Sequence, residues 1–278
     1  KIKDILIRKA QEGVKVRVLY DDVGCWNVHN NFFNEMKSKG VEIYPFLKVV
    51  FPVFTSKVNY RNHRKIVVID GYIGYIGGMN IADRYTDGAK WGIWRDTHFR
   101  IIGKGVHGLQ ASFLVDWYAM SKQILSDKIF YPKTEVYDDN IMQVITSGPI
   151  GPWRNLLQGI IHIITNAKKY IYIQTPYFLP TESLSQALHI AVRLMLPLKS
   201  DTRTVHMASC SFIEEMLRAG AKVYFYKPGF LHSKLVICDD YISCIGSANM
   251  DFRSFEHNFE VNAIVYQTSF AREMKKIF

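Results

Sequence analysis

Two stretches of the chain carry the same chemically capable residues at the same spacing. The first holds His63, Lys65, Asp70, Gly77 and Asn80, and the second holds His232, Lys234, Asp239, Gly246 and Asn249. In both, Lys follows His by two residues, Asp follows Lys by five, Gly follows Asp by seven and Asn follows Gly by three. Five matching positions inside similar apolar runs do not arise by chance, so the chain contains an internal repeat.

The repeated residue types are suited to phosphoryl transfer. On an extended strand, an imidazole and an ammonium two residues apart point to the same face. With the two copies face to face, the lysines neutralise phosphoryl oxygens and the asparagines donate hydrogen bonds to them. One histidine attacks phosphorus, while the other protonates the leaving alkoxide and then deprotonates the acceptor. The repeat therefore predicts one active site for phosphodiesters, with these candidates for its catalytic residues: His63, Lys65, Asp70, Asn80, His232, Lys234, Asp239 and Asn249.

Metal binding by the two histidines is the alternative interpretation. Zinc sites generally add carboxylate or cysteine ligands, and the adjacent ammonium groups would repel a cation. We therefore expect no metal and no cofactor. Asp70 and Asp239 complete the repeat, but both fall where a hairpin must turn, and Asp is favoured at turns. For these two residues we expect a structural role.

Hydrophobic periodicity predicts alternating helices and strands in both halves. In the first half we expect helices over 2–12 and 30–39 and strands over 14–20 and 41–46. In the second half we expect helices near 153–168, 181–190 and 203–218, with strands over 170–177, 192–196 and 222–226. A β-hairpin follows each motif histidine, over 65–76 and 234–245. This order predicts an α/β fold of two similar lobes, 1–135 and 136–278, each a mixed β-sheet flanked by helices.

The two halves differ at two places. The strand over 170–177 has no counterpart in the first half, and a sheet without it would expose a long edge. We therefore expect the natural protein to continue N-terminal to Lys1. Residues 11–15 separate helix from strand in the first half, whereas Ala191 is followed directly by Val192. Because a helix needs a turn before a strand, we expect about five residues to be absent near 190–192.

The paired motif resembles the signature of the phospholipase D superfamily. Further stretches resemble bacterial cardiolipin synthases in particular: Tyr20–Gly24, Asn59–Lys65, Trp94–His98, Ser147–Pro149, Gln174–Phe178 and Gly246–Phe255. The resemblance covers essentially the whole chain. It implies two phospholipase D-like lobes related by a pseudo-twofold axis, a covalent phosphohistidine intermediate and ping-pong transfer. It also implies N-terminal membrane helices, which this sequence does not include.

The resemblance assigns roles to individual residues. By analogy with family members, His63 is the nucleophile and His232 is the general acid and base. The family places a carboxylate behind each catalytic histidine, and the acidic residues that follow the two motifs, Asp96 and Glu260, are our candidates for orienting them. The candidates for substrate binding are Gly78, Ser247, Arg253 and Tyr177. Arg253 binds either a second phosphate or only solvent, and Tyr177 either lines the entrance or packs in the core.

The formal net charge of +10 favours an anionic partner, and nucleic acid and anionic lipid both qualify. Aromatic residues cluster in apolar segments, around 46–54 and at Tyr177-Phe178. These segments suit acyl chains better than base stacking, which interleaves aromatic with basic residues. The segment 45–57 is either a buried strand with a bend or a loop that dips into lipid.

Together these features favour a phosphatidyltransferase that forms cardiolipin and glycerol from two phosphatidylglycerol molecules. The alternative is a phospholipase D-type hydrolase or nuclease with water as the acceptor. We expect phosphatidylglycerol and a membrane surface as partners, and no nucleic acid. The chain has no run of 18 apolar residues. Its four cysteines lack paired spacing and are interpreted as reduced, core or near-core residues. The resemblance places the catalytic region on the cytoplasmic side of a bacterial inner membrane.

Overall fold

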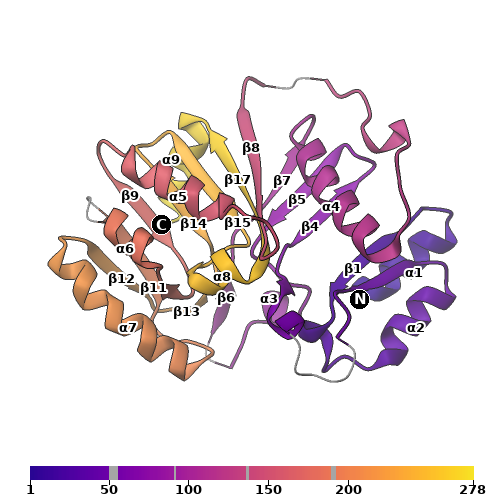
Figure 1. The fold of residues 1–278 in the computed structure, drawn as a ribbon, viewed down its shortest axis with the longest axis horizontal. Coiled ribbons are helices and arrows are strands. Elements are labelled where there is room, and N and C mark those ends of the chain that lie inside the picture. The colour runs from indigo at the N-terminus through magenta and orange to yellow at the C-terminus, as the bar shows by residue number, and fades with distance from the viewer. Residues whose placement is uncertain (50–55, 91, 136–137, 189–191) are drawn as a thin grey trace.

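The computed structural model describes residues 1–49, 56–90, 92–135, 138–188 and 192–278. Two lobes of helices and strands lie side by side, one from each half of the chain (Figure 1). The predicted α/β fold with two similar lobes is confirmed. The division between residues 135 and 136 stays a prediction, because the two halves share strand pairs and a core.

The second lobe is built on a mixed β-sheet that carries the second motif at its centre. The strand order is β12 (Lys222–Tyr226), β11 (Val192–Pro197), β9 (Ile171–Gln174), β14 (Leu235–Cys238), β15 (Ile242–Gly246) and β17 (Asn258–Tyr266). β8 (Ile141–Ser147) lies antiparallel to β17. β12, β11 and β9 are parallel, and β9 pairs antiparallel with β14. The strand β9 therefore connects the parallel strands to the motif hairpin, β14–β15.

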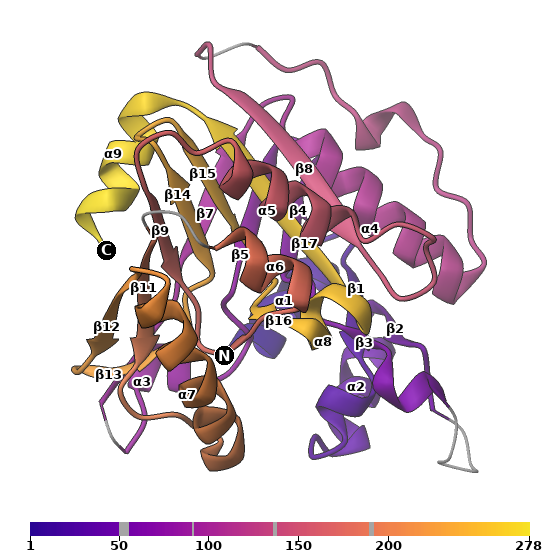
Figure 2. The ribbon, with the colours of Figure 1, turned by 60° about the vertical axis from the view of Figure 1, so that its left-hand side comes forward.

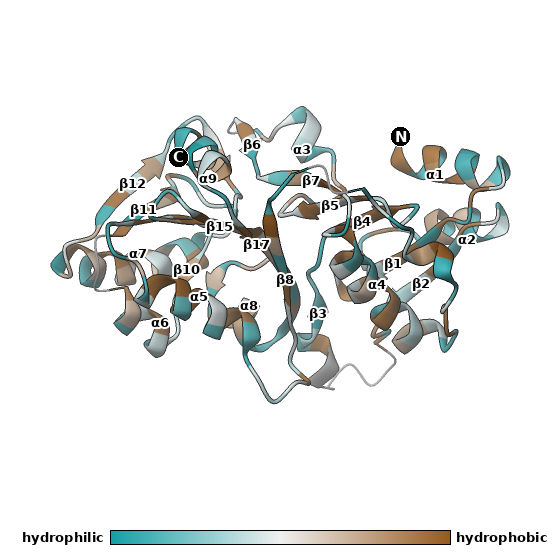
Figure 3. Cartoon of the chain, turned by 90° about the horizontal axis from the view of Figure 1, so that it is seen from above, coloured by the Kyte–Doolittle hydropathy of each residue, from teal (hydrophilic) through white to brown (hydrophobic). Residues whose placement is uncertain are grey.

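Helices cover both faces of this sheet (Figure 3). On one face lie α5 (Asn155–Thr165), α6 (Glu182–Ala187) and α7 (Arg203–Arg218), and on the other lies α9 (Thr268–Lys276). Because side chains alternate along a strand, Val236 and Cys238 of β14 pack into the larger core, whereas Leu235 and Ile237 pack against α9. Burial on both faces explains why the motif strand is an unbroken apolar run.

The first lobe repeats part of this plan, and its described residues hold no counterparts of β8, α5 and β9. α1 (Ile2–Gln11), β1 (Arg17–Asp21), α2 (Asn30–Ser38) and β2 (Glu42–Phe46) occur in the order of α6, β11, α7 and β12. The hairpin of β4 (Ile66–Ile69) and β5 (Ile73–Gly77) follows, with β7 (His98–Ile102) beside β5. α4 (Val106–Ser121) packs against β4 and β2. In the described part of the chain no strand joins β1 to β4 as β9 joins β11 to β14. The expectation of residues before Lys1, which rests on this difference between the halves, stays a prediction.

The two hairpins turn where the sequence predicts. Asp70, Gly71, Asp239 and Asp240 adopt positive φ angles between 52° and 64°. Asp and Gly tolerate this left-handed region better than most residues, and two-residue hairpin turns require it. Each turn lies at the far end of its hairpin, a full strand length away from the motif histidine and lysine.

Two short parallel strand pairs cross from one lobe to the other. β3 (Arg61–Asn62), just before the first motif, pairs with the start of β17, and β13 (Gly229–Leu231), just before the second, pairs with β6 (Ile93–Arg95). β8 and β17 run side by side near the boundary between the lobes (Figure 2). The core is shared as well, because Val261 of β17 packs with Ile76 and Leu109 of the first half. Each motif therefore begins directly after a short strand that pairs with a strand of the other lobe.

The suspected gap near 190–192 and the centre of the apolar segment 45–57 fall mainly on 189–191 and 50–55, which lie outside the described residues.

Cys238 and Cys244 are buried and free, as predicted. Cys210 is exposed on α7, so its prediction as a core or near-core residue was wrong. Among the described helices, none combines the length and apolar character needed to cross a bilayer.

A buried ion pair connects the first motif to both lobes. Arg64, the middle residue of the first His-x-Lys segment, donates hydrogen bonds to both carboxylate oxygens of Asp116 on α4, at 2.7 and 2.6 Å. Its other guanidinium nitrogens donate to the backbone carbonyls of Glu260 and Ser147 in the second half. The Arg64 and Asp116 side chains are only 10% and 12% exposed, so the pair is shielded from water.

We predict that Arg64→Met lowers the free energy of unfolding by about 3–5 kcal/mol, because it leaves the Asp116 carboxylate buried without its partner. The double variant Arg64→Met/Asp116→Leu should recover most of this loss. The control is Arg218→Met, which breaks an ion pair with Glu214. The side chains of Arg218 and Glu214 are 78% and 72% exposed, so this substitution should lower the free energy of unfolding by less than about 0.5 kcal/mol. Urea unfolding measures all three. Equal losses for the two single variants would contradict the assignment.

Candidate active site

Both His-x-Lys segments directly precede the hairpin strands, since β4 and β14 each begin one residue after the motif lysine. The backbone N–H of His63 donates to the carbonyl of Phe259 at 3.0 Å. The backbone N–H of His232 donates to the carbonyl of Arg95 at 2.7 Å. The cross-lobe strand pairs thus continue up to the motif histidines and fix their backbone positions.

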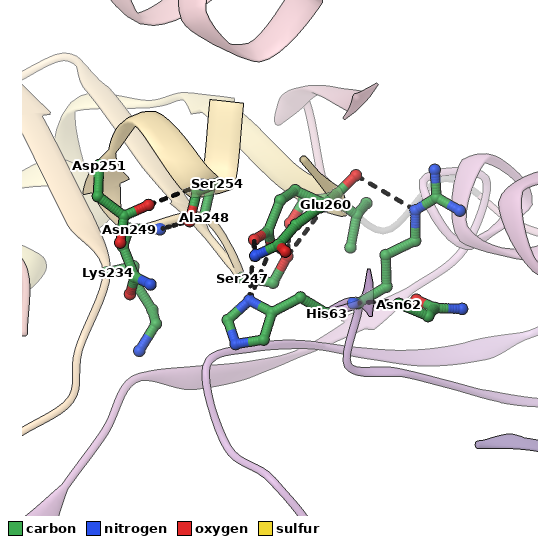
Figure 4. Close-up of polar contacts among 12 residues, drawn as sticks. Asn62, His63, Lys234, Ser247, Ala248, Asn249, Asp251, Ser254 and Glu260 are labelled. Carbon is green, nitrogen blue, oxygen red and sulfur yellow. Dashed lines mark hydrogen bonds and ion pairs between the residues drawn. The ribbon is translucent and has the colours of Figure 1, made fainter. Parts of the chain in front are cut away.

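The two orienting carboxylates are exchanged between the lobes. Glu260, from the second half, has its oxygens 2.9 and 3.0 Å from Nδ1 of His63. Asp96, from the first half, has an oxygen 2.6 Å from Nδ1 of His232. A carboxylate keeps the proton on Nδ1, which leaves Nε2 free for a substrate. In Figure 4 the second ring nitrogen of His63 points away from Glu260. The structure thus brings both predicted carboxylates to the histidines, each to the motif of the other lobe.

Glu260 is the more strongly stabilised of the two carboxylates. It is fully buried, and the Ser247 hydroxyl and the side-chain amide of Asn258 donate hydrogen bonds to it. Burial by itself raises the pKa of Glu260, but His63, Lys65 and the Ser247 hydroxyl outweigh it and hold the pKa at about 2. Glu260 is therefore ionised at neutral pH.

The ionised form of Asp96 is stabilised less than that of Glu260. Its side chain is only 1% exposed, and burial raises its pKa to about 6, although Lys234 and the Thr97 N–H oppose the shift. A side chain at position 78 would not fit, because a Cβ there would lie 2.2 Å from a carboxylate oxygen of Asp96. We predicted that Gly78 and Ser247 bind substrate. The structure instead places both against the orienting carboxylates, where Gly78 leaves room for Asp96 and Ser247 binds Glu260.

The two motif lysines converge on the same site. Lys65 donates a hydrogen bond to the carbonyl of His63 at 2.6 Å, and Lys234 donates one to the carbonyl of His232. Burial, together with the charge of Lys234, lowers the pKa of Lys65 to about 7, and burial lowers that of Lys234 to about 8. Burial also lowers the pKa of both histidines, and both lysine charges act on each ring in the same direction. The charged groups of the two motifs therefore act on one another, as expected when both motifs contribute to a single site.

The other motif residues divide into two groups. Asn249 is buried beside Lys234 (Figure 4), and Asn80 is half-buried. Asp70 and Asp239 are not brought to the site, because they occupy the distant hairpin turns. Asp239 accepts hydrogen bonds from the backbone N–H groups of residues 168–170, and Asp70 is exposed. Their place among the catalytic candidates is corrected, and the turn geometry accounts for both.

Two predicted substrate-binding residues lie away from the carboxylates. The ring of Tyr177 is 6.3 Å from that of Phe230, which is 5.9 Å from the ring of His232. The Tyr177 hydroxyl donates to both carboxylate oxygens of Asp201, at 2.8 and 2.9 Å. Arg253 is exposed on the short helix α8 (Phe252–Glu256). A substrate-binding role for these two residues stays a prediction.

Besides Asn258, sequence reasoning missed three side chains at the site. The Tyr85 hydroxyl, on the short helix α3 (Arg84–Asp87), lies 3.0 Å from Nδ1 of His232. The hydroxyls of Thr97 and Ser233 hydrogen-bond each other at 2.5 Å across the two halves. Tyr85 has no counterpart in the second copy of the repeat, so the repeat gives no signal for it. Ser233 could have been found as the middle residue of its motif.

Within the described residues, no three His, Cys, Asp or Glu side chains gather in a way that could hold a metal ion. The carboxylates nearest the histidines are each directed at Nδ1 rather than at a shared point. The absence of a metal and of a cofactor stays a prediction.

We predict that sulfate binding becomes about tenfold weaker between pH 7 and pH 9. The pKa values of Lys65 and Lys234 are lowered to about 7 and 8, so both ammonium groups lose their protons in this interval. Sulfate itself does not titrate there, and calorimetry in two buffers should show proton uptake on binding at pH 8. The variant Lys65→Met/Lys234→Met should lose this pH response. A flat affinity in the unchanged protein would contradict the shifted lysines.

Comparisons with known proteins agree with this geometry. Residues 1–90 and 160–278 match the family described as cardiolipin synthase, PLD-like domain. Cardiolipin synthase 2 of Bacillus cereus is 45% identical over 286 residues, which cover 100% of this chain and 56% of that protein. The major cardiolipin synthase of Bacillus subtilis is 43% identical over 287 residues, which cover 100% of this chain and 60% of that protein. The chain thus spans a little more than half the length of these relatives.

Among solved structures, phosphatidylserine synthase of Haemophilus influenzae has a similar fold, with a TM-score of 0.69 at 15% identity. The match covers 99% of this chain and 75% of that one, and at this identity it shows the fold alone. The family match and the similarity to curated relatives over the entire chain go further. They show that the chain belongs to the cardiolipin synthase family with a PLD-like domain.

Proposed function

We propose that the chain is the catalytic region of a phosphatidyltransferase, which forms cardiolipin and glycerol from two phosphatidylglycerol molecules. The observation that carries this proposal is the convergence of two His-x-Lys motifs, each with a carboxylate behind its histidine, in a member of this family. Such a site holds one imidazole whose unprotonated Nε2 can attack phosphorus, a second imidazole whose Nε2 can carry a proton, and two ammonium groups, which is what a double displacement at phosphorus needs.

In the first step Nε2 of His63 attacks the phosphorus of one phosphatidylglycerol. The bond from phosphorus to the glycerol oxygen breaks, and Nε2–H of His232 gives its proton to that oxygen, so glycerol leaves and the phosphatidyl group stays on His63. Lys65 and Lys234 neutralise the phosphoryl oxygens, to which Asn80 and Asn249 donate hydrogen bonds.

The unequal carboxylates support this division between the histidines. Phosphorylation of Nε2 makes the His63 ring cationic while Nδ1 keeps its proton, and an ionised Glu260 with a pKa of about 2 stabilises that cation. Burial raises the pKa of Asp96 to about 6, so this carboxylate stabilises a cationic partner ring less than Glu260 does, and His232 releases a proton more readily. The His63 side chain is also 26% exposed against 7% for His232, so the substrate reaches it more easily.

In the second step the hydroxyl of another phosphatidylglycerol attacks the phosphohistidine. Nε2 of His232 removes the proton of that hydroxyl, the bond from phosphorus to Nε2 of His63 breaks, and cardiolipin forms with both rings restored. When water takes the place of the hydroxyl, the product is phosphatidic acid. The same groups therefore serve the alternative function, a phospholipase D-type hydrolase or a nuclease.

The lipid substrate is supported by the relatives' printed function and by the composition. The net charge of +10 would hold the protein at an anionic bilayer by roughly 1 kcal/mol for each well-placed Lys or Arg. We accordingly propose phosphatidylglycerol and a membrane surface as partners, with no nucleic acid, and a location at the cytoplasmic side of a bacterial inner membrane.

The substrate is tested with purified protein and vesicles of phosphatidylglycerol. We expect cardiolipin and glycerol in equal amounts, and a loss of at least about 1,000-fold in rate for either His63→Ala or His232→Ala. Mass spectrometry of the lipids measures the products. Phosphatidic acid alone would change the acceptor to water, whereas cleavage of single-stranded DNA with phosphatidylglycerol left intact would overturn the lipid assignment.

The division of labour is tested with phosphatidyl-p-nitrophenol, whose leaving group needs no proton. Rapid mixing should show a burst of nitrophenolate with His232→Ala but no burst with His63→Ala. Because the carboxylates are exchanged, Asp96→Asn should behave like His232→Ala, and Glu260→Gln should behave like His63→Ala. A phosphoryl group trapped on His232 in place of His63 would reverse the assignment.

A further inference from the structure

The two histidines differ in what surrounds Nδ1. Nδ1 of His63 faces the two oxygens of Glu260. Nδ1 of His232 faces one oxygen of Asp96 at 2.6 Å and, in addition, the Tyr85 hydroxyl at 3.0 Å. With the proton on Nδ1 donated to Asp96, the Tyr85 oxygen is placed as a second acceptor for it.

Tyr85 is itself held in place. The side-chain amide of Asn80 donates a hydrogen bond to its hydroxyl at 3.0 Å, so the phenol oxygen lies between a motif asparagine and a motif histidine. Its ring packs edge-on against Trp94, with centroids 5.8 Å apart. The Arg84 guanidinium lies over the Trp94 ring, 4.7 Å from its centroid. The same guanidinium lies 5.8 Å from the centroid of the Tyr85 ring, so Asn80, Trp94 and Arg84 all hold the phenol in place.

The same aromatic residues enclose the His232 ring. Its centroid is 5.8 Å from the rings of Tyr85 and Trp94 and 5.9 Å from that of Phe230. A single carboxylate contact at Nδ1 fixes the position of that atom and still permits the ring to pivot about it. A second polar contact at the same atom, together with the enclosing rings, restricts the pivot.

We propose that Tyr85 is a positioning residue for His232, which holds the imidazole so that Nε2 faces the leaving group and the acceptor hydroxyl. This inference rests on the proposed function, in which His232 carries the proton in both steps. Tyr85 lies outside the repeated motif, and in this inference it is one reason why His232, rather than His63, carries the proton. Tyr85 does not touch the phosphorus and acts only through His232 and Asn80.

The test is Tyr85→Phe, which removes the hydroxyl and keeps the ring against Trp94. With phosphatidyl-p-nitrophenol in phosphatidylglycerol vesicles, we expect a nitrophenolate burst within twofold of the unchanged protein, because that step needs no proton from His232. Steady-state turnover should fall about five- to tenfold with KM unchanged, because the second step uses His232 as a base. With phosphatidylglycerol as the only substrate, glycerol release should also fall about five- to tenfold, since the proton is then required.

The matched control is Tyr266→Phe, which removes a tyrosine hydroxyl that donates to Gln143 on the surface of the second lobe. It should leave burst and turnover unchanged. A burst that slows as much as the turnover in Tyr85→Phe would indicate a general disturbance of the site and overturn the positioning role, as would unchanged turnover. If His63→Ala and His232→Ala leave turnover unaffected, the proposed function itself fails. The same assays therefore distinguish a failure of the proposed function from a failure of the positioning role.

Discussion

Each catalytic candidate histidine depends on a carboxylate from the opposite lobe. Glu260 can reach His63, and Asp96 can reach His232, only when β3 pairs with β17 and β13 pairs with β6. The exchange ties the formation of the site to the packing of the lobes. An isolated half would have a histidine without a carboxylate and a buried carboxylate without a partner, which is costly in an apolar interior.

This exchange also explains how so much positive charge is kept in one place. Two ammonium groups and two imidazoles act on one another, and burial lowers the pKa of all four. The two carboxylates and the histidine carbonyls compensate part of this charge. Contacts outside the site, such as the Arg64–Asp116 pair, help to hold the groups together. The compensation is incomplete, so the site favours an anion.

The two copies of the motif are nearly alike in sequence and unlike in surroundings. Glu260 receives hydrogen bonds from Ser247 and Asn258, whereas at the corresponding place a glycine leaves room for the shorter Asp96. His232 in turn gains Tyr85 and an aromatic enclosure. The pseudo-twofold repeat therefore provides two similar histidines, and their surroundings make them different, which suits the division of roles proposed for His63 and His232.

The sequence by itself determined the features that depend on local spacing. The repeat, the helices and strands within a few residues, the turns at Asp70 and Asp239, and the two orienting acids all follow from periodicity, turn chemistry and motif resemblance. Only the tertiary structure decided that the acids are exchanged, that Gly78 and Ser247 face them, and that Tyr85 approaches His232. Those contacts join residues up to 197 positions apart, and their partners are chosen by how the two sheets pack, for which a local pattern carries no information.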